Sequence, residues 1–62
     1  MNAIKASERL GFLNNAIVAL GYAIDEASWR QDVLSRHALK LLREELFEER
    51  DDLHERLSGV SI

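Results

Sequence analysis

The side chains in this sequence best suited to metal or acid–base chemistry are two histidines. His37 and His54 lie seventeen residues apart, so neither has a second histidine within a helical turn. Asp51 precedes His54 by three residues, which is the spacing of the acid–x–x–His pairs that hold metals inside helical bundles. His54, however, lies roughly 60–120° around a helix from the leucines of the same segment. We therefore expect His54 to face solvent beside an acid, and we predict no metal site.

Other catalytic arrangements are also absent from the sequence. No helical spacing brings a serine, a histidine and an acid together, although serines occur at positions 7, 28, 35, 58 and 61. The glycines at positions 11, 21 and 59 are isolated, so there is no glycine-rich phosphate loop. The chain has no cysteine, which excludes disulfides and thiolate metal sites. We expect a protein that is not an enzyme and that binds no cofactor.

Acidic residues are concentrated in one segment of the chain. Residues 43–56 contain seven acids against three arginines, in a chain whose net charge is −3. Four of these acids fall within roughly 60° of one another on the side of a helix opposite its leucines. We call this set the acidic stripe, and it consists of Glu44, Glu48, Asp51 and Glu55.

The spacing of these acids is unfavourable for an isolated helix. Like charges four residues apart destabilise a helix by about a few tenths of a kcal/mol per pair. The segment contains the like-charge pairs Glu44–Glu48, Glu45–Glu49, Glu48–Asp52 and Asp51–Glu55, and in this register only Asp52–Arg56 pairs opposite charges. A partner protein with a basic surface, such as a DNA-binding regulator, would relieve the repulsion. The alternative is a solvated outer face that keeps the protein soluble.

Three apolar residues offer a second candidate contact. Trp29, Val33 and Phe47 lie away from the leucines of the expected second helix, within roughly 40° of one another. Because aromatic residues are enriched at protein interfaces, we assign them to partner binding together with the acidic stripe. The alternative places Trp29 in the turn and packs Phe47 across a dimer. Tyr22 suits either role.

The first half of the chain predicts a helix with two apolar faces, since residues 10–24 contain no charge. One face follows a heptad pattern through Ala3, Ala6, Leu10, Leu13, Ile17, Leu20, Ile24 and Ala27. The opposite face consists of Phe12, Ala16, Ala19 and Ala23. A helix that is apolar on two sides must be covered by more than one helix, which predicts a bundle of at least four. The predicted dimer interface is Leu10, Phe12, Leu13, Ala16, Ile17, Leu20, Ala23 and Ile24.

The second half predicts an ordinary amphipathic helix. Its apolar side is formed by Leu39, Leu42, Leu46, Leu53 and Leu57. We expect helices over about 4–23 and 29–57, a turn over about 24–28 with a Ser28–Gln31 capping box, and a tail over 58–62 that begins as Gly59 ends the helix. Two alternatives stay open for the turn: a helix end at Gly21 with Asp25 capping the next helix, and one unbroken helix.

These elements predict the fold class. Residues 1–62 are expected to form one all-α domain, an antiparallel two-helix hairpin that dimerises into a four-helix bundle. A chain this short usually needs a metal, disulfides or a partner subunit, and only the last is compatible with this sequence. In length and helix pattern the hairpin resembles the small RNA-binding hairpins of the Rop type. No motif is shared with them, so no residue roles follow from the resemblance.

The uncharged run does not predict a membrane segment. Its fifteen residues would extend roughly 22 Å as a helix, short of the roughly 30 Å hydrocarbon core of a bilayer. The start of the chain also lacks the features of a targeting signal. We expect a cytoplasmic protein that does not bind membranes.

The sequence favours a small protein-binding regulator or inhibitor that acts as a homodimer, such as an adaptor, antitoxin, anti-activator or phage-type inhibitor. The first alternative is an RNA-binding bundle, because Arg36, Lys40 and Arg43 cluster within about 60°. The second is a structural subunit of an assembly. Direct DNA binding is not expected, since a nucleic-acid binder normally presents a dense basic stripe.

Overall fold

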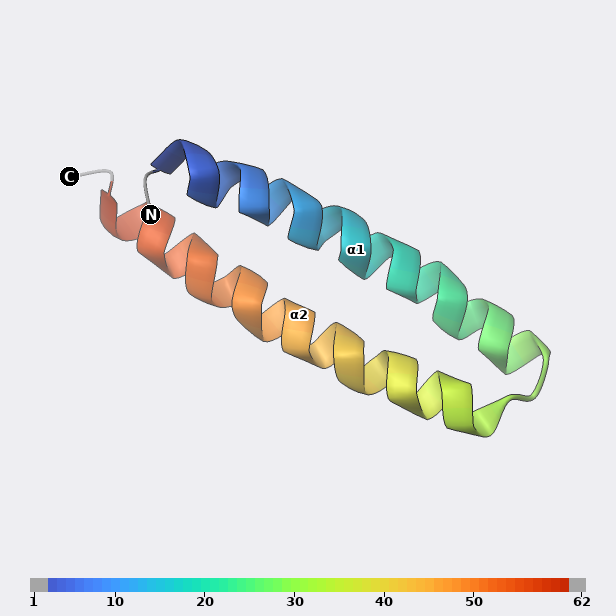
Figure 1. The fold of residues 1–62 in the computed structure, drawn as a ribbon. Helices are drawn as coiled ribbons and strands as arrows, with labels where there is room; N and C mark the ends of the chain where they lie inside the picture. The colour runs from blue at the N-terminus through green and yellow to red at the C-terminus, as the bar shows by residue number, and fades with distance from the viewer. Residues whose placement is uncertain (1–2, 61–62) are drawn as a thin grey trace.

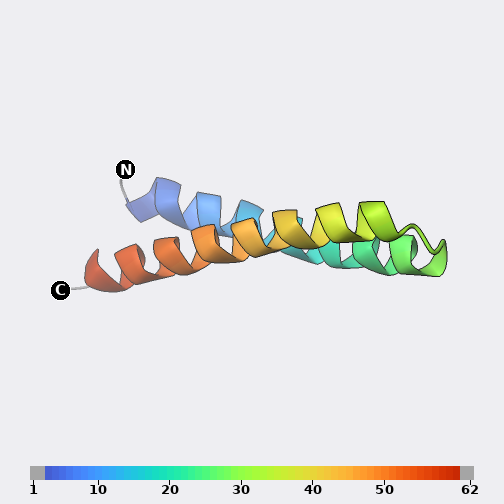
Figure 2. The same ribbon diagram turned by 90° about the horizontal axis from the view of Figure 1, so that it is seen from below.

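The protein is an antiparallel helical hairpin (Figure 1). The computed structural model describes residues 3–60, with side chains for residues 5–59. Helix α1 spans Ala3–Trp29 and helix α2 spans Val33–Val60, so that the two ends of the described chain lie together. The hairpin is a rod of 48 × 14 × 14 Å, in which the helices cross at a shallow angle (Figure 2). The all-α hairpin expected from the sequence is confirmed.

The turn between the helices occupies residues 30–32, so the predicted turn over 24–28 is wrong. Ile24 and Ala27 are buried on the side of α1 that contacts α2, and this packing holds the helix through the segment. Gly21 lies in the middle of α1, and neither Asp25 nor Ser28 begins α2. The heptad pattern that runs past Gly21 was therefore the correct guide to the length of α1.

Helix α1 ends in a Schellman motif. The Gln31 N–H donates to the Ser28 carbonyl at 3.1 Å, and the Asp32 N–H donates to the Ala27 carbonyl at 2.9 Å. Gln31 has a φ of 59°, the left-handed conformation that usually selects glycine at this position. Because the position holds a glutamine, the sequence gives no clear signal for the end of the helix.

The next residue, Asp32, begins α2 as its N-cap. Its Oδ1 accepts a hydrogen bond from the Ser35 N–H at 3.1 Å, and its carbonyl accepts one from the Arg36 N–H at 3.0 Å. Hydrogen bonding by the Ser35 side chain, and then by its backbone N–H, holds the pKa of Asp32 below its usual value. Asp32 thus completes the end of α1 and caps the start of α2, which allows a turn of only three residues.

Replacing Gln31 by glycine is expected to stabilise the hairpin by about 1 kcal/mol, because a side chain in the left-handed conformation costs roughly 1–2 kcal/mol. Urea unfolding followed by circular dichroism measures this change in the free energy of unfolding. Gln31→Ala is the control, since alanine keeps the Cβ atom and should leave the stability nearly unchanged. Equal stability of the glycine and alanine variants would contradict the left-handed conformation.

Helix α2 extends further than predicted. It continues through Gly59 to Val60, so the expected stop at Gly59 is wrong. No glycine in the described part of the chain has a positive φ, which is the conformation that a glycine stop requires. Residues 58–60 of the predicted tail are helical, and residues 61–62 lie outside the described residues.

The core between the helices is thin. Its main cluster consists of buried Ala6, Leu13 and Leu53, with Leu10, Leu46 and Leu57 packed around it. Ile24 and Ala27 are buried nearer the turn, and no side chain of residues 5–59 is completely enclosed. The predicted seams of both helices therefore face each other, except that Leu42 is 45% exposed and that the Ala3 side chain lies outside the described residues. One hairpin leaves much of its apolar surface in water.

Candidate protein-binding surfaces

The acidic stripe lies on the solvent side of α2, where all four of its residues are exposed. Asp51 contacts its neighbour Arg50 at 3.5 Å. Glu44, Glu48 and Glu55 form no salt bridge with another residue that the structure describes. Helix α2 therefore presents unneutralised carboxylates at i, i+4 and i+11 along one side, where no group from α1 offsets their repulsion.

Two neighbouring acids of the segment, Glu49 and Asp52, are paired with arginines. Glu49 accepts hydrogen bonds from two nitrogens of Arg9 on α1, the shorter at 2.6 Å, and this contact links the two helices. The predicted Asp52–Arg56 pair is confirmed, with 3.0 Å between its charged atoms. Glu49 and Asp52 are thus neutralised by arginines, whereas the stripe acids Glu44, Glu48 and Glu55 are not.

The sequence predicts that the three apolar contacts share one surface of the second helix. In the structure they do not. Trp29 is the last residue of α1 and is 87% exposed, whereas Val33 is the first residue of α2. Phe47 lies fourteen residues further along α2, about 21 Å away in an α-helix. The misplaced turn explains the error, because it assigned Trp29 to the second helix.

Phe47 is also less available than predicted. Its half-buried ring lies between two guanidinium groups, with the Arg43 Cζ 5.8 Å and the Arg50 Cζ 4.9 Å from the ring centroid. Such cation–π contacts hold the ring of Phe47 against the surface of α2. The Nε of Arg43 is buried and has no hydrogen-bond partner among the described residues. Arginine side chains therefore lie against part of the surface that Phe47 was predicted to offer a partner.

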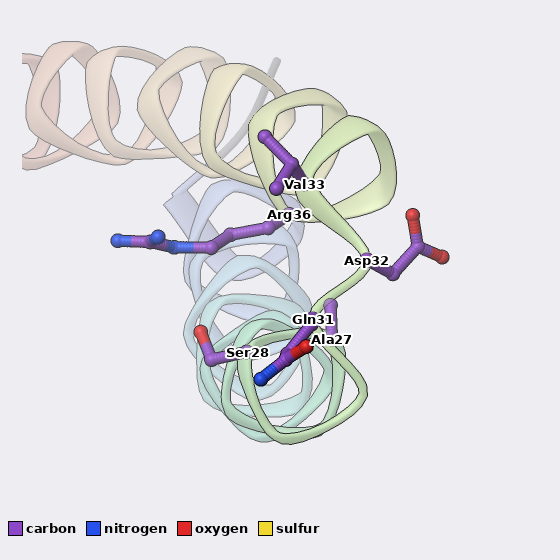
Figure 3. A pocket seen from close by; sticks show the side chains of 6 residues that line it. All are labelled: Ala27, Ser28, Gln31, Asp32, Val33 and Arg36. Atoms are coloured by element: carbon purple, nitrogen blue, oxygen red, sulfur yellow. The ribbon is translucent and has the colours of Figure 1, made fainter.

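An open depression marks the turn end of the hairpin (Figure 3). It is lined by Ala27, Ser28, Gln31, Asp32, Val33 and Arg36. In Figure 3 the side chains of Ser28 and Arg36 extend to one side of the turn and that of Asp32 to the other. The Asp32 carboxylate is occupied as a helix cap, so the depression does not direct several polar groups at one point.

The predicted dimer-interface residues separate into two groups. Leu13 and Ile24 are buried against α2 within the hairpin itself, and Leu10, Ile17 and Leu20 are half-buried, so these residues contribute to the intrachain seam. The other predicted residues are Phe12, which is 70% exposed, and the half-buried Ala16 and Ala23. Only this second group, with the exposed Ala19, is open to a second chain.

The structure also reveals an apolar set on α2 that the sequence analysis missed. Leu34 and Leu41 are 84% and 49% exposed, and Ala38 and Leu42 lie beside them. Their spacing of i, i+4, i+7 and i+8 is typical of the apolar side of an amphipathic helix. This signal is visible in the sequence, but Leu42 also fits the leucine side that faces α1. A second apolar side on α2 is therefore difficult to separate from the first.

Neither helix combines the length and the apolar character needed to cross a bilayer, as far as residues 3–60 are described. The same residues contain no group of three or more His, Asp or Glu side chains placed to hold a metal ion. His54 is exposed, as its position relative to the leucines predicts. Comparisons of the chain with known protein families, curated proteins and solved structures find no match.

Proposed function

We propose that this hairpin is a small, non-enzymatic regulator that works as a homodimer and binds a basic surface of another protein through the acidic stripe. The observation that supports this function is the exposure of Glu44, Glu48 and Glu55 without a salt bridge to another described residue. A basic surface would neutralise their mutual repulsion, so binding would gain energy that the free protein lacks. The regulator would act by occupying that surface, as on a DNA-binding protein.

The distribution of charge along α2 supports a directed contact. Residues 33–43 of α2 contain Arg36, Lys40 and Arg43 and no acid, whereas all of its acids follow from Glu44 onward. The negative potential is therefore concentrated on the half of α2 away from the turn. Such separation orients a basic partner during encounter and makes the association rate fall with salt. The absence of cysteine is in keeping with the reducing cytoplasm, where we expect the protein to act.

The test is capture of partners from the source cells with the full chain as bait, followed by titration calorimetry of the main captured protein. Glu48→Lys/Asp51→Lys should abolish binding and keep the helical content, because it places cations opposite a basic partner. Glu8→Lys/Asp25→Lys is the matched control, since it changes the net charge equally at exposed positions on α1. This control should retain most of the affinity.

Unchanged binding of the stripe variant would reject the acidic stripe as the contact. Capture of the protein alone would instead favour a structural subunit. Stoichiometric capture of a protein whose affinity falls with salt, and is lost only in the stripe variant, would support the proposed function.

RNA is the second candidate ligand, because Arg36, His37 and Lys40 line one surface depression beside Val33. The third cation of the predicted basic cluster, Arg43, lies against Phe47 instead. RNA in the captured material would favour RNA binding as the function. The Arg36→Ala/Lys40→Ala variant should then bind RNA less tightly, and its affinity should depend less on salt.

A further inference from the structure

One side of the hairpin gathers apolar side chains from both helices. The Arg9–Glu49 ion pair joins α1 to α2 and marks this side. On α1, Ala16 and Ala23 follow Arg9 by seven and fourteen residues, so they lie on the same side as the ion pair. On α2, Leu42 precedes Glu49 by seven residues. We call this surface the apolar face, formed by Ala16, Ala19 and Ala23 of α1 and by Leu34, Leu41 and Leu42 of α2.

The apolar face is confined to the half of the hairpin near the turn. Its α2 residues occupy positions 34–42, at the beginning of that helix, and its α1 residues lie in the second half of α1. Toward the chain ends the same side carries the exposed Phe12 and then charged residues, with Arg9 on α1 and Glu45, Glu49 and Asp52 on α2. This side therefore has an apolar half and a charged half.

The amount of exposed surface matches one missing interface. The hairpin has 4966 Å² of solvent-accessible surface. A compact folded monomer of 7.1 kDa would have about 4,100 Å². The excess of roughly 900 Å² is close to the roughly 800 Å² that each partner buries in a standard stable interface.

We propose that the apolar face binds a second copy of this chain, with the two hairpins related by a twofold axis parallel to their length and with both turns at the same end. This inference specifies the geometry of the dimer that the proposed function includes. It does not depend on whether the acidic stripe binds a partner.

The sizes of the apolar side chains favour this arrangement. A twofold axis along the rod places α1 of one copy against α2 of the other. The rotation does not change the position of any residue along the rod, which we call its level. The alanine side of α1 then meets the leucine side of α2 in the second copy, so that small residues receive large ones. With the turns at opposite ends, α1 would meet α1 and α2 would meet α2. With the two rods overlapping along their full length, the apolar half of each copy would then meet the charged half of the other.

The charges favour the same arrangement. Because levels are kept, Arg9 of one copy approaches Glu49 and Asp52 of the second copy, in addition to its own Glu49. With the turns at opposite ends and the rods fully overlapped, Asp52 would instead lie at the level of Leu41 of the second copy. Burying a carboxylate against leucine without a partner is strongly unfavourable. Charge and side-chain size thus select one of the two antiparallel bundles.

This geometry leaves the acidic stripe free. Glu44, Glu48 and Glu55 lie on the side of α2 that faces away from α1, outside the proposed interface. The dimer would present two stripes that run in the same direction on opposite edges of the bundle. Two such stripes suit a twofold-symmetric basic partner, because engaging both sites raises the effective concentration for the second contact.

Distance measurement between spin labels on the purified protein tests the arrangement without any partner. The chain has no cysteine, so Gln31→Cys places one label at the turn and His54→Cys places one near the chain ends. Both positions are exposed and lie outside the apolar face. Labels at Gln31 in both copies should be roughly 20–35 Å apart, from adjacent helices about 10 Å apart plus the label arms. In heterodimers that combine the two variants, the distance from the Gln31 label to the His54 label should be long, because these labels lie near opposite ends of a 48 Å rod.

The opposite pattern, with distant turn labels and close labels in the mixed sample, would overturn the arrangement. The absence of an intermolecular dipolar signal at about 100 μM would overturn the proposal that the apolar face binds a second copy. A dimer with an interface of standard size is normally populated at that concentration. Neither outcome bears on the acidic stripe, which is tested by its own charge-reversal variant.

Discussion

Replacing Leu13 by aspartate is expected to unfold the hairpin. Leu13 is 3% exposed and packs in the cluster with Ala6 and Leu53. The substitution removes a leucine contribution of about 2–5 kcal/mol and adds the cost of burying a carboxylate without a partner. A domain of 62 residues has roughly 3–9 kcal/mol of stability in total. The loss therefore equals or exceeds what is available, and circular dichroism should show loss of most helical signal at 25 °C.

The matched control is Asn14→Asp, which adds the same charge one residue away at an exposed position. It should keep the helical signal and shift the thermal midpoint only slightly, because an exposed carboxylate stays hydrated. Equal stability of the two variants would show that α1 does not pack on α2 through the side that contains Leu13.

Replacing Leu41 by glutamate is expected to dissociate the proposed dimer. Leu41 is 49% exposed in one hairpin and lies in the apolar face, so the substitution places a charge in the proposed interface with the second copy. As a hot-spot residue of the proposed interface, Leu41 would contribute about 2 kcal/mol, and twofold symmetry applies the loss twice. The dissociation constant should rise about a thousandfold, as measured by sedimentation equilibrium. The thermal midpoint should fall and lose its dependence on protein concentration.

Tyr22→Glu is the control for this effect. Tyr22 is also a large exposed residue, but it lies on the outer side of α1, away from the apolar face. Its replacement should leave the dissociation constant within a few-fold of the original value, since surface substitutions outside an interface change the free energy by only about 0.5 kcal/mol. If Tyr22→Glu dissociated the dimer and Leu41→Glu did not, the interface would lie on the outer side of α1 and not at the apolar face.

The position of the turn shows where local sequence signals were insufficient. Glycines and known capping pairs direct attention to Gly21, Asp25 and Ser28, all of which are inside α1. The actual stop uses Gln31 in a left-handed conformation and Asp32 as the cap. The burial of Ile24 and Ala27 against α2 extends α1 past its glycine, because tertiary packing outweighs the roughly 1 kcal/mol helix penalty of a glycine.

The candidate contacts were predicted unevenly for a related reason. The acidic stripe follows from helical periodicity alone, and its exposure agrees with that prediction. The apolar contacts depend on which helix each residue joins. An error of a few residues in the position of the turn grouped Trp29 with Phe47. The second apolar side of α2 could not be separated in the sequence from the leucine side that faces α1, because Leu42 fits both.

The sequence by itself determined the two helices, the side on which they meet and the clustering of acids along α2. These features depend on periodicity, which every helix repeats each 3.6 residues wherever its ends lie. Only the tertiary structure decided the site of the turn and the joining of alanines and leucines on one side of the hairpin. These features depend on how one helix sits against the other, through contacts between residues far apart in the chain, which no local pattern encodes.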